Sequence, residues 1–190
     1  MSPARPALAG TGTLVRFALR RDRIRLPIWV AVLAGLLGSQ SASSQTLYDA
    51  PGALANYRAS IGSSAAAIAF SGPPVGLDSV AGTVAFEISG SVMMAVALLA
   101  MFTTGRHSRA DEEAGRTELV RSAEVGRHAP LIAAVLVSAL TCVATALAIG
   151  IVATSTGLPV PGSFLLGAAV GACGLLFTGV QLWDSAEMGR

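Results

Sequence analysis

The feature that most restricts what this chain can fold into is one charged segment, residues 106–130, set between long apolar runs. The segment holds five arginines and five acidic residues, whereas the runs on either side carry almost no charge. A helix needs about 20 consecutive apolar residues to cross roughly 30 Å of hydrocarbon. We therefore expect the apolar runs to span a membrane and the charged segment to lie outside it.

The composition supports a membrane protein. Hydrophobic residues make up 53% of the 190 residues and charged residues only 13%, with a mean hydropathy of +0.64, whereas a soluble domain carries about 25% charged residues. All thirteen basic residues are arginine, a bias typical of GC-rich bacterial genomes. Cys142 and Cys173 lie inside apolar runs, so we expect small core residues and not a disulfide framework.

Four apolar runs predict transmembrane helices, at residues 27–44, 86–105, 131–155 and 162–183. The expected fold is an all-α integral membrane protein with about four transmembrane helices, and the transmembrane domain covers residues 27–190. The first run is short, and its basic flank and Ala/Ser-rich end are also typical of a cleaved signal peptide. We favour an uncleaved span because three further spans follow.

Arginine placement predicts the topology. Residues 1–26 hold six arginines, the segment after the second span holds five, and residues 45–85 hold one. Cytoplasmic loops collect Lys and Arg, so we expect both termini and the loop 106–130 in the cytoplasm and the loop 45–85 outside the cell. We expect the chain to cross the plasma membrane of a bacterium several times.

An interfacial helix is expected within the cytoplasmic N-terminus, residues 1–26. Leu14 and Phe17 fall on one side at helical spacing, and Arg16 and Arg20 fall on the other. Such a helix lies in the plane of the membrane surface, with its apolar side in the acyl boundary and its arginines among the phosphates.

Glu87 is the candidate intramembrane polar site, because a carboxyl group near a membrane span is a functional hypothesis by default. The alternative interpretation is a hydrated helix end. An intramembrane enzyme that pairs Glu87 with a histidine, His107 or His128, is a rival hypothesis without support from the spacing. The sequence contains no Gly-rich phosphate loop, no nucleophile motif and no Cys/His metal set, so we expect no catalytic residue, no metal and no cofactor.

The central charged segment carries a family resemblance. Residues 113–127, EAGRTELVRSAEVGR, resemble the E-x-G-x-x-E-L-L-x-x-x-P-x-x-R stretch of ABC-2-type transporter permeases, with Glu124 where that family usually has proline. The longer phrase RHSRADEEAGRTELVRSAEVGRHAPL is similar to the N-terminal part of actinobacterial polyketide-antibiotic exporter subunits of the tetronasin-resistance type. Two further phrases, LVRFALRRDRIRLPIW and GPPVGLD, share the resemblance.

The resemblance implies a function. The chain would be a permease of an ATP-driven exporter of hydrophobic or polyketide-type antibiotics, with ATP hydrolysis on a separate ABC ATP-binding subunit. The central loop would be a coupling helix that docks on that subunit through Glu113, Gly115, Glu118, Leu119 and Arg121.

Length separates the chain from this family. An ABC-2 unit has six spans, so we expect a truncated permease whose partners are the ATPase, the lipid bilayer and a second permease unit or a second copy, without nucleic acid. The alternative is a non-transporting four-span membrane scaffold or regulatory protein, which would not depend on an ATPase.

Overall fold

The computed structural model describes residues 10–113 and 129–188, with the side chains at 104–113, 130 and 184–188 excepted. The described chain is all-helical, as the sequence predicts. Its helices, in chain order, are α1 (Thr11–Arg21), α2 (Arg25–Leu47), α3 (Ala53–Ile61), α4 (Ala65–Ser71), α5 (Val80–Glu113), α7 (Ala129–Ser155) and α8 (Val160–Met188).

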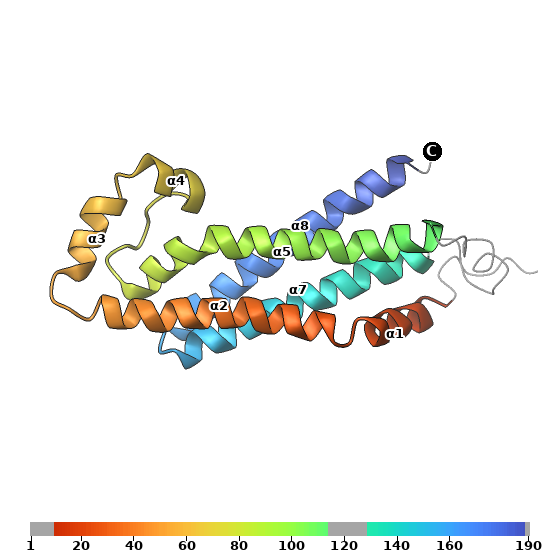
Figure 1. Ribbon diagram of the computed structural model, residues 1–190, viewed down its shortest axis with the longest axis horizontal. Coiled ribbons are helices and arrows are strands. Elements are labelled where there is room, and N and C mark those ends of the chain that lie inside the picture. The colour runs from red at the N-terminus through yellow and green to blue at the C-terminus, as the bar shows by residue number, and fades with distance from the viewer. Residues whose placement is uncertain (1–9, 114–128, 189–190) are drawn as a thin grey trace, which may run out of the picture.

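Four of these helices form an elongated bundle along the long axis of the molecule (Figure 1). In each of them one segment is long and apolar enough to cross a membrane, namely Arg25–Leu47, Val80–Thr103, Leu131–Ser155 and Val160–Trp183. At 1.5 Å per residue the shortest of these segments is about 35 Å long, which exceeds the hydrocarbon thickness of roughly 30 Å. This confirms the expected number of spanning helices.

The second spanning helix is longer than the sequence predicts. It begins at Val80 rather than near residue 86, because the Ser79 hydroxyl accepts a hydrogen bond from the Gly82 N–H at 3.1 Å and so caps the helix start. Its backbone also continues through residue 113, well into the charged segment. The loop expected at residues 45–85 contains two short helices, α3 and α4, at one end of the bundle (Figure 1).

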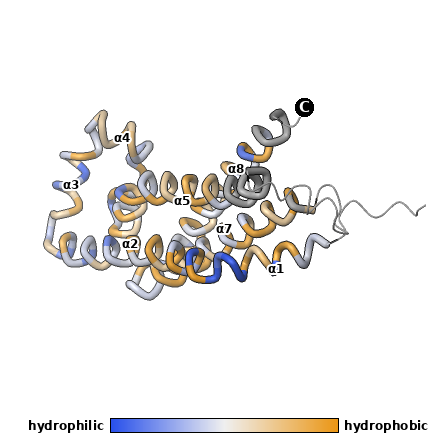
Figure 2. Tube along the Cα trace, turned by 45° about the vertical axis from the view of Figure 1, so that its right-hand side comes forward, coloured by the Kyte–Doolittle hydropathy of each residue, from blue (hydrophilic) through white to orange (hydrophobic). Residues whose placement is uncertain are grey.

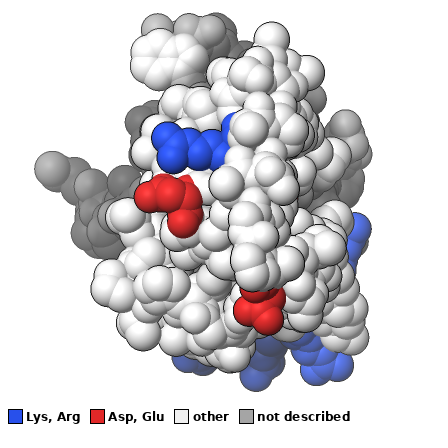
Figure 3. Space-filling model, turned by 90° about the vertical axis from the view of Figure 1, so that its left-hand side faces the viewer, with Lys and Arg blue, Asp and Glu red and all other residues white. Residues whose placement is uncertain are grey.

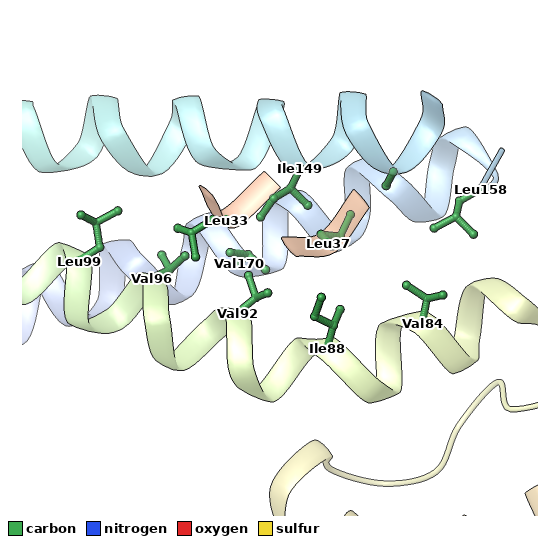
Figure 4. Packing of buried hydrophobic residues seen from close by; sticks show 11 residues of the cluster. Leu33, Leu37, Val84, Ile88, Val92, Val96, Leu99, Ile149, Leu158 and Val170 are labelled. Atoms are coloured by element: carbon green, nitrogen blue, oxygen red, sulfur yellow. The ribbon is translucent and has the colours of Figure 1, made fainter. Parts of the chain in front are cut away.

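The core lies where α2, α5, α7 and α8 meet (Figure 4). Along α5 the buried apolar residues recur every three or four positions, which places them on one face of the helix. Figure 2 shows hydrophobic residues over much of the four long helices, with more hydrophilic residues at the end of α2 that leads to α3. The core residues are Leu33, Leu37, Val84, Ile88, Val92, Val96, Leu99, Ile149, Ala153, Leu158 and Val170.

Helices α7 and α8 approach each other closely. A Cβ atom built on Gly167 would overlap the backbone carbonyl oxygen of Ala146 and would lie 3.3 Å from the Gly150 nitrogen. One turn further on, a Cβ atom on Gly171 would lie 2.9 Å from the Ala146 Cβ atom. The Gly167-x-x-x-Gly171 spacing is therefore a contact surface of the small-residue type that brings membrane helices together.

Helix α1 lies beside the end of α7 that begins at Ala129 (Figure 1). Its Ala18 is buried, whereas Phe17 is 63% exposed. The structure thus contains the expected N-terminal helix, and the position of that helix in the membrane interface stays a prediction. Helix α1 and the end of α5 at Glu113 lie at the same end of the bundle, and α3 and α4 lie at the other end (Figure 1).

Candidate functional site

Most polar side chains inside the spans bond to their own helix. The hydroxyls of Thr103, Thr141 and Thr145 each donate to the carbonyl oxygen four residues earlier, at 2.7–2.8 Å. Such bonds satisfy a buried hydroxyl without a partner on another helix. The candidate site, at the α3–α4 end of the bundle, is the exception, because polar side chains there bond to a different helix.

Glu87, in the second turn of α5, accepts hydrogen bonds from three side chains of another part of the chain. Gln40 Nε2 donates to Oε2 at 2.7 Å, and Ser44 Oγ donates to the same oxygen at 3.3 Å. The Tyr48 hydroxyl donates to Oε1 at 2.7 Å. Hydrogen bonds to an ionised carboxylate are stronger than neutral ones, so Glu87 joins α5 to α2 more firmly than apolar packing alone would.

The helical repeat of α2 positions these donors. Gln40, Ser44 and Tyr48 follow one another at intervals of four residues, so they share one face of the helix. The adjacent face carries Ser41 and Gln45, which both contact Thr156 in the α7–α8 turn. The Ser41 hydroxyl lies 2.7 Å from the Thr156 hydroxyl, and Gln45 Nε2 donates a hydrogen bond to the Thr156 carbonyl oxygen. The polar end of α2 thereby connects to both neighbouring parts of the bundle.

Tyr57, from α3, completes the cluster around Glu87. Its ring lies edge-on to that of Tyr48, with 5.3 Å between centroids. Burial and the negative charge of Glu87 raise the pKa of Tyr57 to about 12. Burial and the hydrogen bond to Glu87 also raise the pKa of Tyr48. Both phenols therefore stay protonated at physiological pH and remain hydrogen-bond donors.

A cleft of about 680 Å³ opens beside Tyr48 at this end of the molecule. Arg58 and Asp78 are the charged side chains among the described residues that line it. The surface at this end carries few charged groups (Figure 3), as expected of a loop region with a single arginine. Glu87 and its partners, the polar cluster, thus lie between the core of the bundle and this cleft.

The arrangement can fasten α2 to α5 through the carboxylate of Glu87. All three donors to Glu87 are neutral groups, so hydrogen bonds rather than a formal ion pair with them stabilise the carboxylate. Within the part of the chain that the structure describes, no group of three His, Cys, Asp or Glu is arranged to hold a metal ion. The interpretation of Glu87 as a merely hydrated helix end does not account for these three bonds.

The pairing of Glu87 with His107 has no geometric basis. Both residues belong to α5, and the twenty residues between them correspond to about 30 Å along a helix. His128 lies outside the described residues.

The side chains of the proposed coupling residues lie outside the described part of the chain. Glu113 is the last residue of α5, and its side chain is outside the described part of the chain. Gly115, Glu118, Leu119 and Arg121 lie in the segment 114–128, which the structure does not describe. The contacts of Gln40 and Ser44 were not foreseen from the sequence, where both residues belong to the Ala/Ser-rich end of the first apolar run.

Comparison with known proteins places the chain beside a transporter. No protein-family model matches it. It is 41% identical to the multidrug efflux system permease protein Rv1217c of Mycobacterium tuberculosis over 189 residues, which cover 95% of this chain and 34% of that relative. The chain thus spans about a third of the length of the curated relative it matches.

This similarity, together with four spanning helices, supports a multi-pass membrane permease. A permease is a component of a transport system and not an enzyme, in agreement with the prediction that the chain itself is not an enzyme.

Proposed function

We propose that this chain is the membrane-spanning permease part of an ATP-driven ABC exporter of hydrophobic or polyketide-type antibiotics, coupled to a separate ATP-binding subunit. The observation that carries the proposal is the 41% identity to a multidrug efflux permease across 95% of the chain. Because the chain spans a third of that relative, further spans in the same polypeptide or in a second copy would complete the transport path.

Helix α5 is suited to carry motion between the two ends of the bundle. It is continuous from Val80 to Glu113, so Glu87 and Glu113 are about 39 Å apart on one rigid element. In our proposal the ATP-binding subunit docks on Glu113 and on the segment that holds Gly115, Glu118, Leu119 and Arg121. ATP-driven closure of that subunit would then shift α5 and α7 as rigid bodies.

Glu87 is proposed to resist this motion at the other end. A shift of α5 relative to α2 would separate the Glu87 carboxylate from Gln40 and Ser44, which hold it at 2.7 and 3.3 Å. The two arrangements, bonded and separated, would correspond to two positions of the helix pair. Rigid-body switching requires such discrete alternatives.

The outer surface of the bundle supports a membrane setting and further protein partners. Leu165, Leu176 and Trp183 of α8 are each more than 70% exposed. Lipid tails or a second permease unit would cover these side chains, since a large exposed apolar surface marks a membrane or protein interface.

The test is a docking experiment with a matched control. The chain is co-expressed with the ABC ATP-binding subunit of the same organism, and Leu119→Asp is compared with Thr117→Asp, which adds the same charge two residues away, on the other side of the proposed helix. We expect Leu119→Asp to reduce co-purification of the ATPase and efflux of a fluorescent hydrophobic dye, and Thr117→Asp to change both less. Full co-purification with Leu119→Asp, and with Glu118→Arg, would reject the coupling role and favour a membrane scaffold independent of any ATPase.

A further inference from the structure

We propose that the turn between α1 and α2 holds one anionic phospholipid, with its phosphate on the arginines of the turn and one acyl chain in a groove between α2 and α5. The inference is independent of the proposed transport function. The groove has a volume of about 400 Å³. Its lining residues are Asp22, Arg25, Leu26, Trp29, Ala95, Leu98, Leu99, Phe102 and Thr103.

The groove is charged at one end and apolar along its walls, which matches the charged headgroup and apolar chain of a phospholipid. Its polar end is formed by Asp22, which caps the end of α1, and Arg25, which begins α2, and its walls are formed by apolar side chains of α2 and α5. Three of those wall residues are well exposed because no other part of the described chain covers them: Trp29 at 43%, Leu98 at 48% and Phe102 at 66%. A hydrocarbon chain would bury these surfaces, and burial of apolar area is favourable.

The charge of the turn selects the headgroup. Residues 20–25 contain four arginines and one aspartate, a net charge of +3, and Figure 2 shows this turn as a strongly hydrophilic stretch between hydrophobic helices. The four arginines are exposed, whereas Asp22 is 5% exposed and is engaged in an interaction of its own. Clusters of arginine beside membrane helices attract anionic lipid headgroups, and the same cluster repels a cationic amphiphile.

The groove lies at the depth where headgroups and acyl chains meet. Arg25 begins one candidate span, and Thr103 ends another, so both mark the same boundary of the hydrocarbon region. Trp29 lies one turn inside that boundary, where an interfacial aromatic residue is expected. A phospholipid has its charged group and its apolar chain on the two sides of this boundary, which matches the groove.

Trp29 allows a direct test, since the chain has two tryptophans and Trp183→Phe leaves Trp29 as the single indole, which can be excited selectively. The purified chain is reconstituted into phosphatidylcholine vesicles that contain a small fraction of brominated phosphatidylglycerol or, in parallel, of brominated phosphatidylcholine. Bromine quenches a nearby indole, so quenching reports which lipid occupies the groove. We expect the anionic lipid to quench Trp29 at a severalfold lower fraction than the zwitterionic lipid.

Two variants and one control separate the groove from the bulk bilayer. Arg25→Gln should lower the preference for the anionic lipid about fivefold, and Ala95→Leu should reduce quenching by both lipids by narrowing the groove. Arg58→Gln, at the opposite end of the bundle, should change neither. Equal quenching by the two lipids would overturn the proposal, and so would equal effects of Arg25→Gln and Arg58→Gln. Absence of quenching by either lipid would mean that a second copy or another segment covers the groove, which also rejects the lipid site.

Discussion

The close approach of α7 and α8 makes a quantitative prediction about Gly167. In Gly167→Ala the new methyl group meets the backbone carbonyl of Ala146, and its distances to the Ala146 carbonyl carbon and the Gly150 nitrogen are 3.2 and 3.3 Å. Backbone atoms cannot rotate away as a side chain can, so α7 and α8 have to separate. Overpacking of this kind costs about 1–3 kcal/mol.

Gly179→Ala, in the same helix, is the matched control, because a Cβ atom there meets no other atom within 4 Å. Both variants gain the same helix-propensity term, about 0.5–1 kcal/mol for replacement of glycine by alanine in a helix interior. That term cancels when the two are compared. The difference between them is therefore the overpacking cost alone, about 1–3 kcal/mol, or roughly five- to 150-fold in the unfolding equilibrium.

The assay is reversible unfolding of the detergent-solubilised chain, followed by helical circular dichroism in mixed micelles of increasing denaturing-detergent content. Gly179→Ala should be as stable as the unmodified chain or slightly more stable, and Gly167→Ala should unfold at a clearly lower detergent fraction. Gly171→Ala should fall between them, because a Cβ atom there would lie 2.9 Å from the Ala146 Cβ atom and 3.2 Å from the Cys142 carbonyl oxygen, which is less severe than the overlap at Gly167. Equal stability of Gly167→Ala and Gly179→Ala would refute the close α7–α8 packing.

Three further predictions concern the polar cluster and the topology. The chain has two tyrosines, so phenolate absorbance reports on the cluster alone, and Glu87→Gln should move the Tyr57 midpoint from about 12 part of the way toward 10.0 by removing the nearby charge; an unchanged midpoint would contradict the contact. The pKa of Tyr57 is higher in the folded chain than in the unfolded chain, so its contribution to stability is complete below pH 10 and is lost between about pH 10 and 12. Tyr57→Phe should therefore lose less stability than the unmodified chain when unfolding is measured at increasing alkaline pH. An identical pH dependence of the two chains would reject the linkage. In a background without native cysteines, a membrane-impermeant thiol reagent added to intact cells should label Ala55→Cys and not Ser108→Cys, and the reverse pattern would invert the predicted orientation.

Much of the architecture could be predicted from the sequence because a bilayer imposes a simple rule. A backbone surrounded by hydrocarbon has to satisfy its own hydrogen bonds, so long apolar runs become helices whatever their neighbours are. Hydropathy therefore sufficed for four spanning helices between residues 25 and 183. The helix ends were less predictable, because the start of α5 at Val80 depends on the local cap by Ser79.

The role of Glu87 could not be derived in the same way. The sequence marked it as a carboxyl group near a span, with a functional or a hydrated state as alternatives. Its donor Gln40 is 47 residues away, and nothing in the order of residues states which face of α2 turns toward α5. Only packing of the whole bundle determines that rotation, since it buries Leu33 and Leu37 against α5 and thereby directs Gln40 and Ser44 toward the carboxylate.

The sequence by itself thus determined the class of the protein, the number of its spanning helices and the position of its charged segment, because each of these depends on local hydropathy and charge. Tertiary structure alone decided which polar residues meet at Glu87 and which glycines bring α7 to α8. It also decided that the arginine-rich turn at residues 20–25 opens into an apolar groove against α5. These features depend on the rotation and register of helices distant in sequence, and contacts between distant segments carry no signature in the order of residues within either one.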